Sequence, residues 1–245
     1  MGVTFTALDI NRDTADHTTP YSTASVIPTA NQPVLIAVMT SVGSGTAPTP
    51  VLSGCGLTFT QLELQAGTRT FALYLGIGAS PFTGAISIAG DGVATLTSAM
   101  WAVVQCAGVD TTTANGLVQS ISFSGTAAAS ANVAFTNPIN SANSAFAATQ
   151  INAGSVSTPG TGWTDLGSTI VATPASGMDA MSAIPAVQDI LSTSAPGTVR
   201  VAGCEMKAAT SGNLNDVKAG SGNVSLAVGS SPVTSAFVGS TQVYP

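Results

Sequence analysis

Charged side chains are scarce in this 245-residue sequence: they make up 7% of it, against about 25% in ordinary soluble domains. Five are Lys or Arg and eleven are Asp or Glu, which gives a formal net charge of −6. Proteins that bind nucleic acids neutralise phosphates with clustered cationic side chains. We therefore expect no nucleic-acid partner.

Catalytic motifs are also lacking. The only histidine is His17, so a His-assisted serine or cysteine nucleophile would have to use it. The segment from Gly76 to Gly78 lacks the remaining glycine of a dinucleotide-binding loop. The acidic residues are too few and too scattered for spacing to nominate a hydrolytic pair. We expect a protein that is not an enzyme, with no catalytic residues and no cofactor.

Three cysteines, Cys55, Cys106 and Cys204, are odd in number and lie far apart, without the spacing of a metal site. We expect them to be buried, unpaired thiols in a chain made in a reducing cytoplasm. Mean hydropathy is +0.41, yet no apolar run approaches the roughly 18 residues that span a bilayer. No basic segment followed by an apolar one begins the chain, so we expect neither a secretory signal nor a membrane partner.

What the sequence does have is Ala, Gly, Ser, Thr and Val, arranged in short apolar runs between turn residues. Three runs, at 71–77, 85–89 and 100–106, are separated by Gly- and Pro-containing gaps, a pattern typical of strands. Alternation puts Phe71, Leu73 and Leu75 on one face of the first run. Trp101, in the third run, is expected at the centre of a core between two sheets. The fold class that follows is all-β.

The same pattern predicts strands at 34–39, 118–123, 145–151, 168–173, 178–184 and 198–206. We divide the chain into an N-terminal arm at 1–32, a β-sandwich domain at 33–207, and a C-terminal extension at 208–245. The extension is expected to add edge strands or inter-subunit contacts.

The arm contains the densest cluster of charge, residues 9–17. Asp9, Asp13, Asp16 and His17 offer oxygen and nitrogen donors. Their spacing fits no known loop motif, so a solvated or inter-subunit loop is preferred to a metal site.

Several segments together resemble β-sandwich modules of tailed-bacteriophage structural proteins. They are Ser53-Gly54-Cys55-Gly56-Leu57-Thr58, Leu73-Tyr74-Leu75-Gly76, Ala99-Met100-Trp101-Ala102-Val103-Val104, Gly108-Val109-Asp110-Thr111-Thr112 and Gly162-Trp163-Thr164-Asp165-Leu166-Gly167. The resemblance covers roughly residues 33–207. It implies a jelly-roll-like antiparallel β-sandwich, here with extended N- and C-terminal segments, and a structural role in the virion.

The expected function is that of a capsid decoration, or cement, protein, which stabilises a shell through many contacts between subunits. A surface so poor in charge suits a protein covered by neighbours. The expected partners are the major capsid protein or other virion proteins and further copies of this chain, and the expected location is the virion. A tail or fibre component is the alternative within this class.

A carbohydrate-binding adhesion module, with a host surface glycan as partner, is the alternative from a different class. It needs exposed aromatic rings, and Trp163 is the first candidate for a sugar-stacking platform. We prefer to place Trp163 in the core, over one end of the sandwich. A hydrolase would require an acid pair facing a deep pocket.

Overall fold

The computed structural model describes residues 2–16, 20–91, 95–127, 134–172, 175–183, 191–192, 197–209, 227–228, 231–232, 236–238 and 241–243. Strands and turns make up nearly all of them, with one 3-10 turn at Ala114–Gly116. Gly2–Ala209 forms one compact unit, and Thr210–Pro245 divides from it. Among the residues described, no helix is long and apolar enough to span a membrane.

The first half of the compact unit is an eight-stranded jelly roll. Its strands are divided between two antiparallel sheets, as in a double Greek key, and β5 and β6 follow one another within the larger sheet. The larger sheet has the order β1 (Thr4–Asp13), β8 (Ser98–Ala107), β3 (Val34–Ser41), β6 (Arg69–Ile77) and β5 (Thr58–Gln65). The smaller sheet has the order β2 (Tyr21–Ser22), β7 (Ile86–Gly90) and β4 (Pro50–Gly54).

The second half repeats this arrangement. Its larger sheet has the order β9 (Leu117–Ala127), β15 (Gly197–Met206), β10 (Ser144–Ile151), β13 (Ala175–Ala183) and β12 (Trp163–Ala172). Outside it, β11 (Thr158–Pro159) pairs with β14 (Leu191–Ser192), just as β4 pairs with β7. Taken in chain order, each strand of the second large sheet holds the position of its counterpart in the first. The compact unit therefore consists of two jelly rolls whose large sheets and outer strand pairs share one topology, although β2 has no counterpart among the described residues of the second half.

Local hydrogen bonds support the equivalence. Before β3, the Thr29 amide donates to Gln105 Oε1 at 2.9 Å; before β10, the Asn140 amide donates to Glu205 Oε1 at 3.0 Å. The turn that leads into the hairpin of each large sheet is also repeated. It reads Gly-Cys-Gly-Leu-Thr at 54–58 and Gly-Thr-Gly-Trp-Thr at 160–164, and in each the fourth residue's amide donates to the first residue's carbonyl at 3.1 Å.

Strand register then assigns equivalent positions. Val34 lies opposite Gln105 as Ala145 lies opposite Glu205, so these pairs correspond. Counting along the ladders gives two rows of residues across the central strands of each sheet. In the outward-facing row, Val38, Ala72 and Trp101 correspond to Thr149, Asp179 and Val201; in the inward-facing row, Met39, Phe71 and Met100 correspond to Gln150, Met178 and Arg200.

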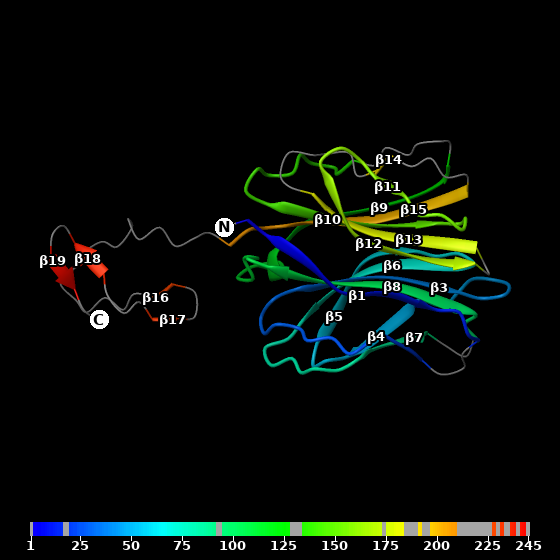
Figure 1. Cartoon of the computed structure of the whole chain (residues 1–245), viewed down its shortest axis with the longest axis horizontal. Helices are drawn as coiled ribbons and strands as arrows, with labels where there is room; N and C mark the ends of the chain where they lie inside the picture. Colours follow the sequence, from blue (N-terminus) through cyan, green and yellow to red (C-terminus); the bar gives the residue numbers. More distant parts are fainter. Residues whose placement is uncertain are drawn as a thin grey trace. The chain divides into compact units, whose positions relative to one another are not determined.

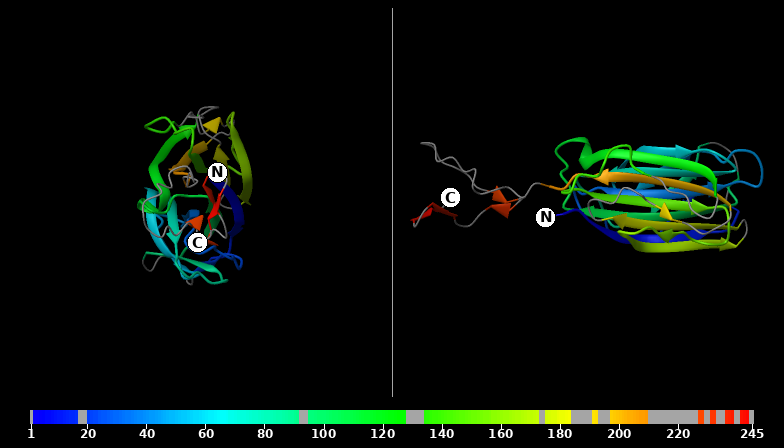
Figure 2. Two further views of the ribbon diagram at one scale, coloured as in Figure 1. Left: turned by 90° about the vertical axis from the view of Figure 1, so that its left-hand side faces the viewer. Right: turned by 90° about the horizontal axis from the view of Figure 1, so that it is seen from above.

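The two large sheets pack face to face, and the smaller sheets lie outside them (Figure 1; Figure 2). Strand β1 contacts β12, and its counterpart β9 contacts β5; β8 contacts β13, and β15 contacts β6. Each contact thus has its exchanged equivalent, so the halves pack as a pseudo-twofold pair. Both faces of each large sheet are covered, which explains why β3 and β10 are buried along their whole length.

Three hydrophobic cores separate the layers. The inter-sheet core, between the two large sheets, includes Leu35, Phe71, Leu73, Phe146 and Met178. The first-half core lies under the small sheet and includes Tyr21, Ile36, Ile88 and Trp101. The second-half core lies on the outer face of the second large sheet and includes Ile151, Trp163, Met181 and Val201.

The expected all-β, jelly-roll-like antiparallel sandwich is confirmed, and the strands expected at 34–39, 71–77 and 100–106 lie inside β3, β6 and β8. The expectation that residues 1–32 form an arm outside the sandwich is wrong. Its residues 4–13 form β1, which pairs with β8 and buries Val3 at its start. Phe5 and Ile10 pack on the inter-sheet core, because their side chains alternate inward from an edge strand. The sandwich accordingly begins near Gly2 rather than at residue 33.

In the C-terminal unit the described residues form two short hairpins. Strand β16 (Ala227–Val228) pairs with β17 (Ser231–Pro232), and β18 (Ala236–Val238) pairs with β19 (Thr241–Val243). Their pairing partners lie within the unit itself. The inter-subunit role of this extension stays a prediction.

Candidate functional site

The residues expected in the core are buried. Phe71, Leu73 and Leu75 lie in the inter-sheet core. Trp101, only 3% exposed, lies between the large and small sheets of the first half, where its indole Nε1 donates to Asp9 Oδ2 at 2.7 Å. Trp163 is 7% exposed and belongs to the second-half core. A ring buried to this extent offers no open face for a sugar, which removes the observation that the adhesion alternative needed.

The charged segment at 9–17 has a structural use. Besides the indole of Trp101, Asp9 Oδ2 accepts the Ala24 amide at 2.9 Å, so this carboxylate ties β1 to the segment that follows β2. Asp13 accepts the Ala15 amide at 2.9 Å. His17 lies outside the described residues. Within the described part of the chain, no three His, Cys, Asp or Glu side chains come close enough to hold a metal ion.

The three cysteines are buried and unpaired. Burial raises the pKa of Cys55, Cys106 and Cys204 above the ordinary thiol value. A thiol with a raised pKa forms little thiolate at neutral pH, so these side chains are poor nucleophiles and metal ligands. They act as small apolar side chains in the cores.

An acid pair that the sequence did not nominate lies on the second large sheet. Asp179 is 1% exposed, and its Oδ2 accepts the Ser157 hydroxyl at 3.0 Å. Burial, and then the negative charge of Asp165, raise the pKa of Asp179 to about 7. Neither acid lines either of the two cavities considered below. Neither of these two cavities therefore supplies, among the described residues, the deep pocket that the hydrolase alternative requires.

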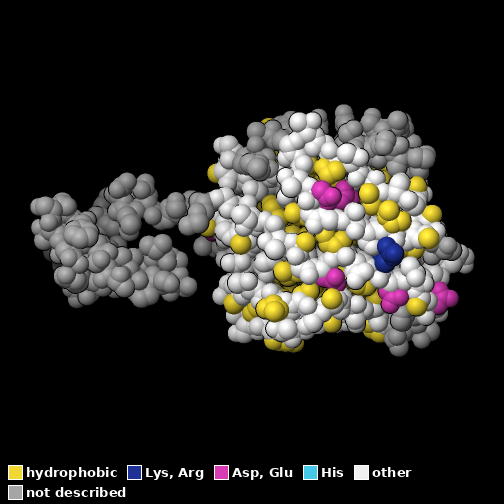
Figure 3. Space-filling model, in the orientation of Figure 1, with side chains coloured by type: hydrophobic (Ala, Val, Ile, Leu, Met, Phe, Trp, Pro, Cys, Tyr) yellow, Lys and Arg dark blue, Asp and Glu magenta, His cyan; other side chains and the backbone are white. Residues whose placement is uncertain are grey.

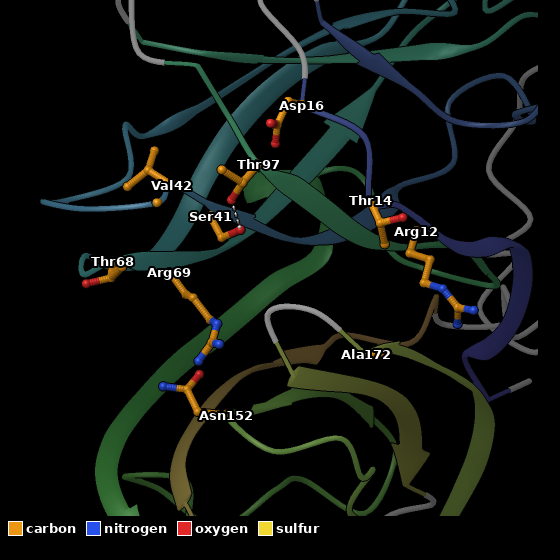
Figure 4. A pocket seen from close by; sticks show the side chains of 11 residues that line it. Arg12, Thr14, Asp16, Ser41, Val42, Thr68, Arg69, Thr97, Asn152 and Ala172 are labelled. Carbon is orange, nitrogen blue, oxygen red and sulfur yellow. Dashed lines mark hydrogen bonds between the residues drawn. The ribbon is translucent and has the colours of Figure 1, made fainter.

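A cavity of about 980 Å³ opens at one end of the sandwich. Residues from both halves line it: Arg12, Thr14, Asp16, Ser41, Val42, Gly43, Thr68, Arg69, Thr97, Asn152 and Ala172 (Figure 4). In this close-up Arg69 points toward Asn152, so a side chain of the first half faces one of the second across the inter-sheet space (Figure 4). Backbone turns and strand ends at the rim of a sandwich are where jelly rolls carry most of their variable side chains.

All three arginines of the chain gather at this end. Arg12 and Arg69 line the cavity. Arg200 does not line the cavity itself and is 8% exposed. It reaches the lining through Asn152: its Nη1 donates to Asn152 Oδ1 at 3.4 Å and to Gln150 Oε1 at 2.9 Å. Burial lowers the pKa of both Arg69 and Arg200, and the charge of Arg69 lowers that of Arg200 further. Sequence spacing could not have shown this cluster, because the three residues come from β1, β6 and β15.

A second, smaller cavity of about 330 Å³ surrounds Glu205. This buried carboxylate accepts the Asn140 amide at 3.0 Å and Asn143 Nδ2 at 2.6 Å on one oxygen, and Gln119 Nε2 at 2.6 Å on the other. Since its lone pairs are used to hold the chain before β10, we interpret Glu205 as a structural residue.

Comparison of the chain with protein-family models, curated proteins and solved structures found no match. The resemblance to phage virion modules therefore stays a prediction.

Proposed function

We propose that this chain is a non-enzymatic structural protein of a bacteriophage virion, and within that class a capsid decoration protein. The observation that carries the proposal is the surface. Across the face shown in Figure 3, hydrophobic and uncharged polar side chains cover most of the sandwich, and charged side chains are few and separate. A surface of this kind suits a subunit whose faces are covered by neighbours.

Large apolar side chains stand out from the first jelly roll. Ile27 is 70% exposed and Phe82 is 60% exposed. The two segments that carry them are joined, because Val26 and Gly84 form an antiparallel bridge. We call Ile27 and Phe82 the apolar tip. Exposed aromatic and aliphatic anchors of this kind dominate the binding energy of many protein interfaces.

The pseudo-twofold pair of jelly rolls supports the proposal in a second way. A decoration protein has to keep its shape while it holds neighbours together, and here one core joins both halves. Because the shared core is closely packed, a mechanical force on one half is transmitted to the other through its side chains. The separate C-terminal unit, Thr210–Pro245, would supply a further contact.

A tail or fibre role would use the same surface, and the position of the protein in the particle separates the two. Cryo-electron microscopy of the virion of the phage that encodes the chain provides the test. The proposal predicts two stacked jelly rolls on the outside of the shell. Density on the tail would favour the alternative, and absence of the chain from purified virions would refute the whole class.

Variants of the apolar tip test the contact itself. Ile27→Ser with Phe82→Ser should keep the fold, because both side chains are exposed, and should reduce co-sedimentation with capsid shells at least tenfold. Ile170→Ser, which changes a 37% exposed side chain on the second half, is the matched control and should co-sediment like the unchanged protein. Unaltered co-sedimentation of the tip variant would move the contact to another face.

A further inference from the structure

We propose that the cavity at the arginine end binds an oxyanion, a carboxylate or phosphate group, carried by a small hydroxylated molecule. Arg69 and Arg200 would hold the anion, with the Asn152 amide beside them. This inference does not depend on the virion role, since it rests on the residues of the cavity alone.

The first observation is uncompensated charge. In the described part of the chain, no carboxylate forms an ion pair with Arg69 or Arg200; the ion pair that is present joins Lys207 to Asp110, at 2.8 Å. Asp16 also lines the cavity, but Figure 4 shows it well away from the facing Arg69 and Asn152 side chains. Arg200 is buried and Arg69 is half-buried, and two cations held beside one another away from water cost free energy unless an anion joins them. A ligand is the simplest source of that anion.

The second observation is unpaired hydrogen-bond donors. The Nε atoms of Arg69 and Arg200 are both buried and have no partner among the described residues, and nearby Gln65 Oε1 is unpaired as well. A buried donor without a partner costs about 1–3 kcal/mol, more when it is charged. Guanidinium groups bind carboxylate and phosphate through paired N–H donors, so two of them suit an oxyanion.

The third observation comes from the repeat. Arg200 lies opposite Gln150 on β10, whereas the equivalent pair of the first half is Met100 opposite Met39, both in the inter-sheet core. The fold therefore accepts two methionines at this position. The second half instead places an amide and a guanidinium there, and a buried guanidinium without a carboxylate partner costs free energy that two methionines do not. A bound anion would offset that cost.

The cavity is also prepared for a ligand. Gln150 and Asn152 hold the Arg200 guanidinium, and Gly67 leaves room for it: a Cβ at Gly67 would lie 2.9 Å from Arg200 Nη2. Hydroxyl groups of Thr14, Ser41, Thr68 and Thr97 line the rest of the space, with Ser41 and Thr97 hydrogen-bonded at 2.9 Å. Positioned donors bind without a large ordering cost.

The size and lining indicate the rest of the ligand. About 980 Å³ is far more than one phosphate ion fills and is the size of an ordinary small-molecule site. Hydroxyl and amide groups would hydrogen-bond ligand hydroxyls. The described residues of the lining include no aromatic ring, so they offer no stacking surface for a neutral sugar. The anionic group must therefore carry the affinity.

Three molecules that share one sugar ring test the proposal by isothermal titration calorimetry. Glucose is neutral, glucuronate carries a carboxylate, and glucose 6-phosphate carries a phosphate; inorganic phosphate serves as a fourth probe. We expect glucuronate or glucose 6-phosphate to bind at least tenfold more tightly than glucose. Which of the two binds better identifies the anion. If inorganic phosphate bound but neither glucuronate nor glucose 6-phosphate did, the site would hold an adventitious ion only, and the proposal would be overturned.

Variants locate the site. Arg69→Met and Arg200→Met, the latter installing the residue of the first half, should each weaken binding of the preferred anion at least tenfold. Lys207→Met, which removes a cation elsewhere on the chain, should leave the affinity unchanged. Circular dichroism confirms that each variant is folded, and Arg69→Gln replaces any that is not. Absence of anion binding to the unchanged protein, or full affinity in the folded Arg69 variants, would overturn the inference.

Discussion

The two jelly rolls share a topology but fill it differently. Across the centre of its large sheet the first half places Val38, Ala72 and Trp101 beneath a three-stranded sheet. The second half places Thr149, Asp179 and Val201 at the same positions, where its outer layer is the short pair β11–β14. These positions of the first half, which we call the apolar frame, are filled by apolar side chains. The second half has polar side chains at two of the same three positions, so the fold does not require them there.

The inter-sheet row shows the same contrast, with Met39 and Met100 in the first half and Gln150 and Arg200 in the second. Polar groups in a buried row lower stability unless every donor and acceptor has a partner. A duplicated fold can tolerate this, because the apolar half and the shared core stabilise the whole unit. The comparison teaches that one topology accepts an apolar row across the centre of its large sheet in the first half and a partly polar row in the second.

The largest effect is expected from removing β1. Deleting residues 1–16 removes an edge strand whose Phe5 and Ile10 pack on the inter-sheet core, and we expect the compact unit not to fold. A chain that ends at Ala209 should instead melt at the temperature of the full chain, because Thr210–Pro245 is a separate unit. Thermal unfolding followed by circular dichroism measures both. A folded N-terminal deletion would restore the interpretation of this segment as an arm.

Trp101→Ala should have the next largest effect, about 3–5 kcal/mol of unfolding free energy, because it empties the centre of the first-half core and leaves Asp9 without its indole donor. Trp163→Ala should cost less, since among the described residues the second-half core contains fewer buried hydrophobic side chains than the first-half core. Urea unfolding of both variants gives the two values. A larger loss for Trp163→Ala would reverse the assignment of the frame to the first half.

Asp179 should make stability depend on pH in one direction. Its pKa of about 7 in the folded protein lies above the ordinary value of 3.8, so the folded state holds the proton more tightly than the unfolded state. The free energy of unfolding should therefore be greatest near pH 4 and decrease as the pH rises through 7. Asp179→Asn should flatten this dependence and stabilise the protein at pH 8.

Asp110 makes the free energy of unfolding depend on pH in the opposite direction and in a lower pH range. Its hydrogen bonds, first with Lys207 and then with Thr112, lower its pKa to about 2, so its contribution is lost only as the pH falls below 4. Unfolding by urea between pH 4 and 8 measures the effect of Asp179 apart from it. If Asp179→Asn kept the full pH dependence, another group would be responsible.

The smallest effects are expected at the equivalent positions Gln105 and Glu205, where the first half has an amide and the second half a carboxylate. Gln105 Nε2 donates to the Pro33 carbonyl at 2.8 Å, and a carboxylate could not. Gln105→Glu should cost about 1–3 kcal/mol at neutral pH by placing an acceptor against that carbonyl. Glu205→Gln should cost less, because one amide oxygen can still accept the Asn140 and Asn143 donors. Equal costs would show that the contact with the Pro33 carbonyl does not determine the cost of Gln105→Glu.

The sequence predicted the strands whose side chains carry a strong pattern. The run at 34–39 and that at 71–77 are apolar throughout because both faces of their sheet are buried, and Trp101 lies in the core where its run placed it. The sequence pattern of the N-terminal strand is weaker, because its inward residues Phe5 and Ile10 lie among polar ones next to a dense charge cluster. Its edge position and the bulge between Ala7 and Asp9 explain that pattern.

The repeat escaped prediction although a signal was present. The two turns at 54–58 and 160–164 share Gly-x-Gly, a large apolar residue and Thr, but equivalent core positions differ in size and polarity, as Trp101 and Val201 do. Duplicated folds keep their ladders and turns while their side chains diverge. The arginine end had no sequence signal at all, because only the packing of the two sheets brings Arg69 and Arg200 together.

The most direct test of the central claim, that two jelly rolls form one unit around a shared core, uses the tryptophan that each half contains. In Trp163→Phe the fluorescence reports on the first half, and in Trp101→Phe on the second. Urea unfolding of each variant is followed by fluorescence and by far-ultraviolet circular dichroism together. One cooperative unit predicts that the two signals coincide within each variant. A fluorescence midpoint clearly displaced from the circular dichroism midpoint in either variant would show that the halves unfold independently, and would contradict the account.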